Sequence, residues 1–98
     1  MEIAFKDKSL ERLYTDKTAT SRLPDAVVTA FRRRMQSIRA AHSTLDFRSN
    51  KGMHFERIKG QRQHQHSMRL NDQFRLVLEL QEQDERTLVL IVSVEDYH

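Results

Sequence analysis

The pattern of hydrophobic and polar residues changes from helical spacing in the first half of the chain to alternation in the second. From Leu23-Pro24-Asp25 onward, four hydrophobic residues follow at the spacing of one helix face. Pro is suited to the first helical position, and an early acid is favoured at the positive helix end. The pattern therefore predicts a helix that ends near residues 40–42, with a buried stripe of Val27, Phe31, Met35 and Ile38.

Shorter elements flank this helix. Residues 3–5 predict a first strand, and Asp7 fits the N-cap of a short helix over the residues that follow. Residues 43–46 predict one further short helical turn.

After Gly52 the alternating pattern predicts strands over residues 53–58, 66–71, 74–80 and 87–94. In the third strand Arg75 points away from the face that carries Phe74, Leu76, Leu78 and Leu80. The last strand is almost wholly apolar, which predicts a central strand covered on both faces. This order of elements predicts an α+β sandwich with helices on one face of a sheet.

Composition narrows the class of protein. A chain of 98 residues with 38% hydrophobic residues suffices for one small domain over residues 1–98. The absence of cysteine excludes a disulfide framework, a thiolate metal site and a cysteine nucleophile. Charged residues interrupt the apolar positions of residues 1–25, so we expect a soluble cytosolic protein without a membrane segment.

Charge is distributed unevenly. Residues 26–75 hold eleven Lys/Arg and three Asp/Glu, a net charge of +8, whereas residues 76–98 have a net charge of −5. A basic middle is typical of a protein that binds a polyanion, because clustered cations release counterions from phosphates. A solvated basic surface explains the same charge, and charge alone leaves both interpretations open.

Candidate chemistry is concentrated in the second half. There is no Gly-rich phosphate loop, and His64-Gln65-His66 lacks a third ligand at recognisable spacing, so we expect neither a cofactor nor a metal. Residues 54–75 are instead dense in Arg, Lys and His. Such a set can cleave a phosphodiester without metal, since the reaction needs a base, cations for the phosphorane and an acid for the leaving oxygen.

Two segments resemble a known family. The string Arg69-Leu70-Asn71-Asp72-Gln73-Phe74-Arg75 and the terminal Glu95-Asp96-Tyr97-His98 are similar to motifs of the HigB toxins, also called plasmid maintenance killer proteins, of the RelE superfamily. Further similarity lies in Leu45-Asp46-Phe47-Arg48 and Glu56-Arg57-Ile58-Lys59-Gly60, and it extends over nearly everything from Phe5 onward.

The resemblance implies a toxin of a type II toxin-antitoxin system, with a small twisted, mostly antiparallel sheet and two helices packed on one face. It further implies a metal-independent endoribonuclease that cleaves mRNA in the ribosomal decoding site. The expected partners are mRNA, the ribosome and a HigA-like helix-turn-helix antitoxin, with operator DNA bound only through the antitoxin.

Site residues follow by matching positions. Phe74 stands where the family motif usually has Trp. The candidates for the general base are Glu56 and His98, and the imidazole of His98 can act as acid or base. Asn71 and Gln73 match the motif as supports. The catalytic candidates are Arg75, His98, Tyr97, Glu56 and Arg69, and the substrate-binding candidates are Lys59, Arg62, Asn71, Gln73 and His66.

Two other functions use the same basic surface. One is a non-catalytic module that binds RNA or the ribosome, and the other is a degenerate toxin that acts as a co-regulator with its antitoxin. The terminal Tyr97-His98 favours cleavage over pure binding, because a binding module has no need of an imidazole beside an arginine.

Overall fold

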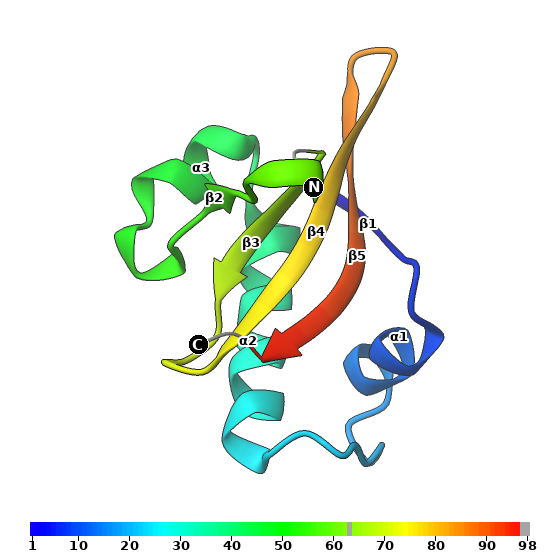
Figure 1. Cartoon of the computed structure of the whole chain (residues 1–98). Coiled ribbons are helices and arrows are strands. Elements are labelled where there is room, and N and C mark those ends of the chain that lie inside the picture. The colour runs from blue at the N-terminus through cyan, green and yellow to red at the C-terminus, as the bar shows by residue number, and fades with distance from the viewer. Residues whose placement is uncertain (63, 97–98) are drawn as a thin grey trace.

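A five-stranded sheet forms the centre of the molecule in the computed structural model, which describes residues 1–62 and 64–96. The strand order is β1-β5-β4-β3-β2, with β1 parallel to β5 and the other pairs antiparallel (Figure 1). The predicted α+β class and mostly antiparallel sheet are therefore confirmed. The strands are β1 (Glu2–Phe5), β2 (Glu56–Arg57), β3 (Gln65–Arg69), β4 (Phe74–Gln83) and β5 (Arg86–Asp96).

The helices begin close to the predicted positions. The Asp7 side chain accepts a hydrogen bond from the Ser9 amide at 2.8 Å, as expected of an N-cap. Pro24 is the N-cap residue of the long helix rather than its first helical residue, a difference of one position. The helical elements are α1 (Lys8–Thr15), α2 (Asp25–Ala40), α3 (Thr44–Ser49) and the 3₁₀ turns η1 (Lys51–Met53) and η2 (Gly60–Arg62).

The core lies between α2 and one face of the sheet. All four residues of the predicted α2 stripe are at most 1% exposed. They pack in one cluster with sheet residues such as Met68, Leu76 and Ile91, and Figure 1 shows α2 crossing behind the sheet. We call this the core face and the opposite side the open face. The open face presents Ser67 and Arg69 of β3, Arg75, Val77 and Glu79 of β4, and Ser93 and Glu95 of β5.

A β-bulge in β5 decides which of its residues reach the open face. Val77 pairs with Ser93 but Leu78 pairs with Ile91, so Val92 is the extra residue on β5. Strict alternation would place Ile91, Ser93 and Glu95 on the same face. With the bulge, Ile91 stays in the core and Glu95 lies on the open face.

One strand prediction is wrong, and another is confirmed only in part. Residues 53–58 do not form one strand, because Met53 ends η1 with its side chain in the core and His54 has a left-handed backbone (φ 47°). Only the two residues of β2 remain extended. The last strand is central as predicted, between β1 and β4, but its second face is only partly covered, since Leu88 and Leu90 on that side are partly exposed.

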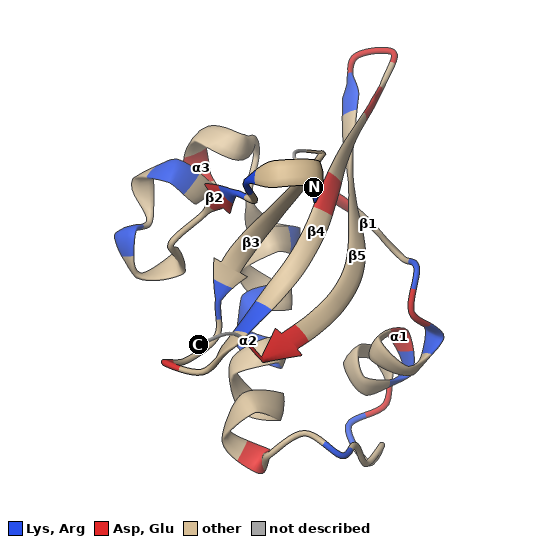
Figure 2. Cartoon of the chain, viewed as in Figure 1, with Lys and Arg blue, Asp and Glu red and all other residues tan. Residues whose placement is uncertain are grey.

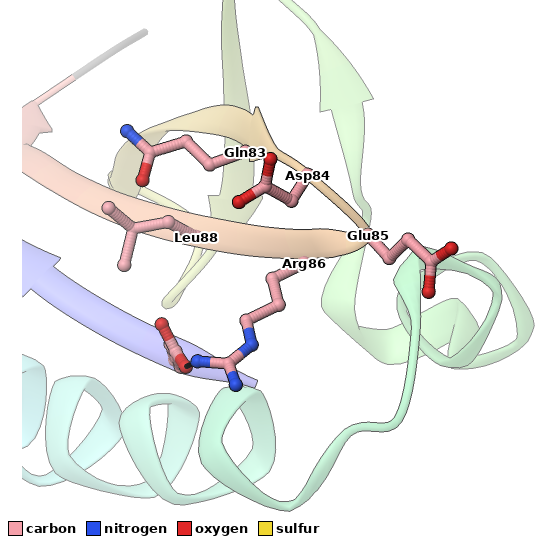
Figure 3. Close-up of a pocket in the computed structure, with 6 residues that line it drawn as sticks. Gln83, Asp84, Glu85, Arg86 and Leu88 are labelled. Atoms are coloured by element: carbon pink, nitrogen blue, oxygen red, sulfur yellow. Dashed lines mark hydrogen bonds and ion pairs between the residues drawn. The ribbon is translucent and has the colours of Figure 1, made fainter.

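The β4–β5 hairpin extends beyond the sheet and forms a separate surface (Figure 1). An open pocket of about 860 Å³ lies beside its tip, where Arg86 Nη1 contacts Glu2 Oε1 at 3.2 Å (Figure 3). Its lining is mostly exposed and lies at the opposite end of β5 from Glu95. Among the residues that the structure describes, no helix is long and apolar enough to span a membrane.

Candidate active site

One row of charged side chains crosses three neighbouring strands on the open face. Arg69 pairs with Arg75 across β3 and β4, and Arg75 pairs with Glu95 across β4 and β5. Residues directly opposite in a sheet have their side chains on the same face, about 5 Å apart at Cβ. Figure 2 shows the acidic end of β5 beside a basic part of β4. Two of the five predicted catalytic residues, Arg69 and Arg75, therefore lie side by side.

Glu95 is the centre of this group. Arg62 of η2 donates to both of its carboxylate oxygens, from Nη1 to Oε1 at 2.9 Å and from Nη2 to Oε2 at 2.6 Å. Arg75 Nη2 lies 3.4 Å from Oε1, and the Ser93 hydroxyl donates to Oε2 at 2.9 Å. These donors, with Arg62 foremost, lower the pKa of Glu95 to about 2. Glu95 is thus a carboxylate at any physiological pH.

The Arg62 side chain reaches across the sheet. Its Nε donates to Gln65 Oε1 at 2.9 Å on β3, and its guanidinium ends at Glu95 on β5, so the side chain spans β4. Val77 of β4 faces the same side and is fully buried. Gln65 is only 8% exposed. Its Nε2 donates a 3.1 Å hydrogen bond to Glu79 Oε2, which extends the network to β4. The hydrogen bond with Glu95 raises the pKa of Arg62, which remains a cation.

Asn71 lies in the turn between β3 and β4. Its Oδ1 accepts from the amides of Gln73 at 2.9 Å and Phe74 at 2.7 Å, which fixes the turn that leads into Arg75. The Gln73 side chain donates to Asp96 at 2.9 Å. Both residues thus hold backbone segments next to the charged row.

Arg69 is held from two sides. Its guanidinium is paired with the exposed carboxylate of Asp72, three residues further along the chain. Its carbonyl accepts a 2.8 Å hydrogen bond from Nη2 of Arg34 on α2, and burial lowers the pKa of that arginine. The helical spacing of the α2 stripe gives no signal for this contact between α2 and the end of β3.

Glu56 and Lys59 lie further from the row. Glu56 pairs with Ser67, which places it on the open face at the outer strand β2, and its side chain is exposed. Lys59 follows β2 and lines a shallow depression of about 350 Å³ with Arg57, Ile58 and Gly60. The sheet therefore puts Glu56 on the same side as Arg75, two strands away from β4.

His66 lies on the opposite side of the sheet from Arg75. Its ring stacks on Phe55, with centroids 4.8 Å apart and planes 3° apart, and its register partner Leu78 belongs to the core. Burial, with Arg57 and Arg48 nearby, lowers its pKa, so the imidazole is neutral at pH 7. The predicted substrate-binding residues therefore do not form one group, because His66 packs on the core side of the sheet.

The predicted residues Tyr97 and His98 lie outside the described residues. Asp96, directly before them, is the last residue of β5. Among residues 1–62 and 64–96, no group of three or more His, Asp or Glu is arranged to hold a metal ion.

Sequence reasoning missed Ser93 and Glu95 as site residues. The signal for Glu95 was the acidic segment that follows the basic segment ending at residue 75. In the fold, Glu95 of the acidic segment is the counterion of Arg62 in the basic segment. The alternation of residues along β5 gives no sign of the bulge that turns Glu95 to the open face.

Comparison with solved structures supports the fold. The fold is similar to a YoeB/ParE toxin from Agrobacterium tumefaciens, with a TM-score of 0.57 and 11% identity, over the full length of both chains. At this identity the likeness concerns the fold alone.

Sequence comparison defines the family. Residues 3–98 match the model of the HigB family, described as the RelE-like toxin of a type II toxin-antitoxin system. The Toxin HigB-1 of Vibrio cholerae is 33% identical over 79 residues, which cover 81% of this chain and 83% of that protein. The chain belongs to the HigB-like toxins, and it is a toxin of a type II toxin-antitoxin system with an antitoxin as its partner.

Proposed function

We propose that this toxin is a metal-independent endoribonuclease that cleaves mRNA in the decoding site of the ribosome. The observation behind the proposal is the placement of three guanidinium groups, those of Arg62, Arg69 and Arg75, on one open face of the sheet. A cleaved phosphodiester passes through a phosphorane with extra negative charge, and cations placed in advance stabilise that charge.

The proposed reaction is an internal displacement at phosphorus. The 2′-oxygen forms a bond to phosphorus as its proton passes to a base, and the bond from phosphorus to the 5′-oxygen breaks as that oxygen receives a proton. Arg75, with Arg69 beside it, stabilises the charge of the phosphorane. The base is Glu56 or His98, and the acid for the leaving oxygen is His98 or Tyr97.

The remaining predicted residues either bind RNA or support the structure of the active site. Arg62 and Lys59 contact phosphates that flank the scissile bond. Asn71 and Gln73 act through the backbone, since their side chains are engaged in the β3–β4 turn and in the contact with Asp96. We leave His66 out of the RNA site because its ring lies against Phe55.

The ribosome supplies the orientation that a small scaffold lacks. An open sheet face holds a flexible RNA strand poorly, whereas mRNA in the decoding site is already positioned. We propose that the protein acts in the cytoplasm and that its antitoxin is a HigA-like helix-turn-helix protein, through which alone the toxin is brought to operator DNA.

Induction in cells tests this proposal against a binding module or a degenerate co-regulator. The toxin is induced alone or together with the neighbouring open reading frame, and mRNA ends are mapped. We expect growth arrest with cleavage in phase with codons, and rescue by the neighbour. Arrest without new mRNA ends would favour the non-catalytic module, and no arrest would favour the co-regulator.

A further inference from the structure

Glu95 occupies a site with the donors that a phosphate requires. A fork of two guanidinium nitrogens from Arg62, one nitrogen of Arg75 and the hydroxyl of Ser93 converge on its two oxygens at 2.6 to 3.4 Å. Two parallel N–H donors from arginine recognise carboxylates and phosphates alike. The carboxylate is therefore an internal anion in a pocket of donors that would suit an external one.

We propose that Glu95 is a built-in stand-in for an RNA phosphate, and that the phosphate displaces it from Arg62, Arg75 and Ser93 when substrate binds. The ligand is thus a phosphodiester bound in exchange for a carboxylate of the protein itself. The inference rests on the proposed function for its substrate class, but the site consists of residues of this chain alone.

The exposure of the group permits this exchange. The side chains of Arg62, Glu95 and Arg75 are 40%, 29% and 22% exposed, so each is reachable from solvent without unfolding of the sheet. Arg62 belongs to the three-residue turn η2, which begins at Gly60 in a left-handed conformation (φ 81°), and its side chain bonds to Gln65 of the sheet. A side chain on such a turn can change partner without disturbing the core.

The charge balance supports the same conclusion. The two arginines have a charge of +2, and Glu95 already cancels one of these charges, so an incoming phosphodiester meets a net charge of only +1 while Glu95 stays in place. While Glu95 stays, it competes with any anion for the same donors. The apparent affinity for phosphate is then reduced by the fraction of molecules in which the site is open.

Inorganic phosphate is the probe for the first experiment, with binding followed by NMR of the Arg62 Nε–H signal. In E95Q the competing charge is gone, and we expect phosphate to bind about tenfold more tightly than in the wild type, as for a site previously open in about a tenth of molecules. The matched control is E85Q, which removes one negative charge at the hairpin tip, about 30 Å along β5. We expect that control to change affinity less than twofold.

A second background separates the exchange from a general charge effect. In R62Q, the further change of Glu95 to Gln should give no gain beyond that of E85Q, because the phosphate lacks its main donor. Equal gains from E95Q and E85Q, or weaker phosphate binding in E95Q, would overturn the proposal. The second result would make Glu95 a support for the arginines rather than their competitor.

The wild-type protein gives an independent reading that holds even where a variant does not fold. Phosphate must shift the Glu95 carboxyl carbon signal and the Arg62 Nε–H signal together, with one common dissociation constant. Binding that leaves the Glu95 signal unmoved would overturn the exchange. These titrations involve no cleavage, so absence of ribonuclease activity would contradict the proposed function and leave the phosphate result to stand alone.

Discussion

Gln73 donates a hydrogen bond from Nε2 to Asp96 Oδ2 at 2.9 Å, which ties the β3–β4 turn to the end of β5. The two residues are 23 positions apart, and Asp96 directly precedes the predicted catalytic residues Tyr97 and His98. The contact therefore connects the turn that leads into Arg75 with the segment that we expect to supply proton transfer.

Loss of this contact should lower activity more than stability. In Q73L we expect cleavage to fall about 10- to 100-fold, because small misplacements of reacting groups have effects of that size. The melting temperature should change little, since Gln73 is exposed. The matched control is Q83L on the hairpin, and equal cleavage rates for the two variants would show that the contact has no part in the reaction.

Deletion of His98 tests the proposed proton transfer. We expect cleavage on ribosome-bound message to fall by about 100- to 10000-fold, the range for loss of a general acid or base. Removal of one terminal residue should leave the melting temperature and antitoxin binding unchanged. Undiminished cleavage would exclude His98 and shift the role to Glu56 and Tyr97.

Glu95 should make stability depend on acid pH. Its pKa is about 2 in the folded protein against an ordinary value of 4.5, so the unfolded chain takes up the proton first as pH falls. The stabilisation that Glu95 provides is complete above about pH 5 and is lost between pH 4.5 and 2.

Urea unfolding of wild type and E95Q measures this contribution. At pH 7 we expect E95Q to be less stable by about 1.5 to 3 kcal/mol, the range for hydrogen bonds to a charged group. The difference should shrink steadily below pH 4.5. A difference that stays constant from pH 7 to pH 3 would contradict the low pKa.

The salt dependence of RNA binding should be smaller than the net charge of residues 26–75 suggests. Many of those cations lie on helices, and on the open face Arg62, Arg69 and Arg75 each contact a carboxylate. Three phosphate contacts to a single strand predict a log-log slope of about −2. A flat response would exclude these contacts, and a slope steeper than about −5 would require a wider basic surface.

Local rules were sufficient to predict most of the fold. The stripe of α2, the cap at Asp7 and the strand with Arg75 opposite the Leu76 face follow from spacing and turn chemistry, and the structure confirms them. Residues 53–58 were misjudged because an alternating pattern does not reveal a 3₁₀ turn that brings Met53 into the core.

The site was only partly predictable for a different reason. Arg69 and Arg75 come together through strand register, which a hairpin with a short turn determines locally. The contact between Arg62 and Glu95 joins residues 33 positions apart and requires the bulge at Val92, so it is a property of the assembled sheet. The Arg34 contact with Arg69 depends in the same way on how α2 crosses the sheet.

The most direct test measures cleavage of mRNA by purified toxin on translating ribosomes. We expect the wild type to cut message in the decoding site efficiently and naked RNA poorly. R75A should lose about 100- to 1000-fold in rate, as for loss of one donor to the transition state, whereas R86A on the hairpin should retain full activity. No cleavage by the wild type, or equal rates for R75A and the wild type, would contradict the account.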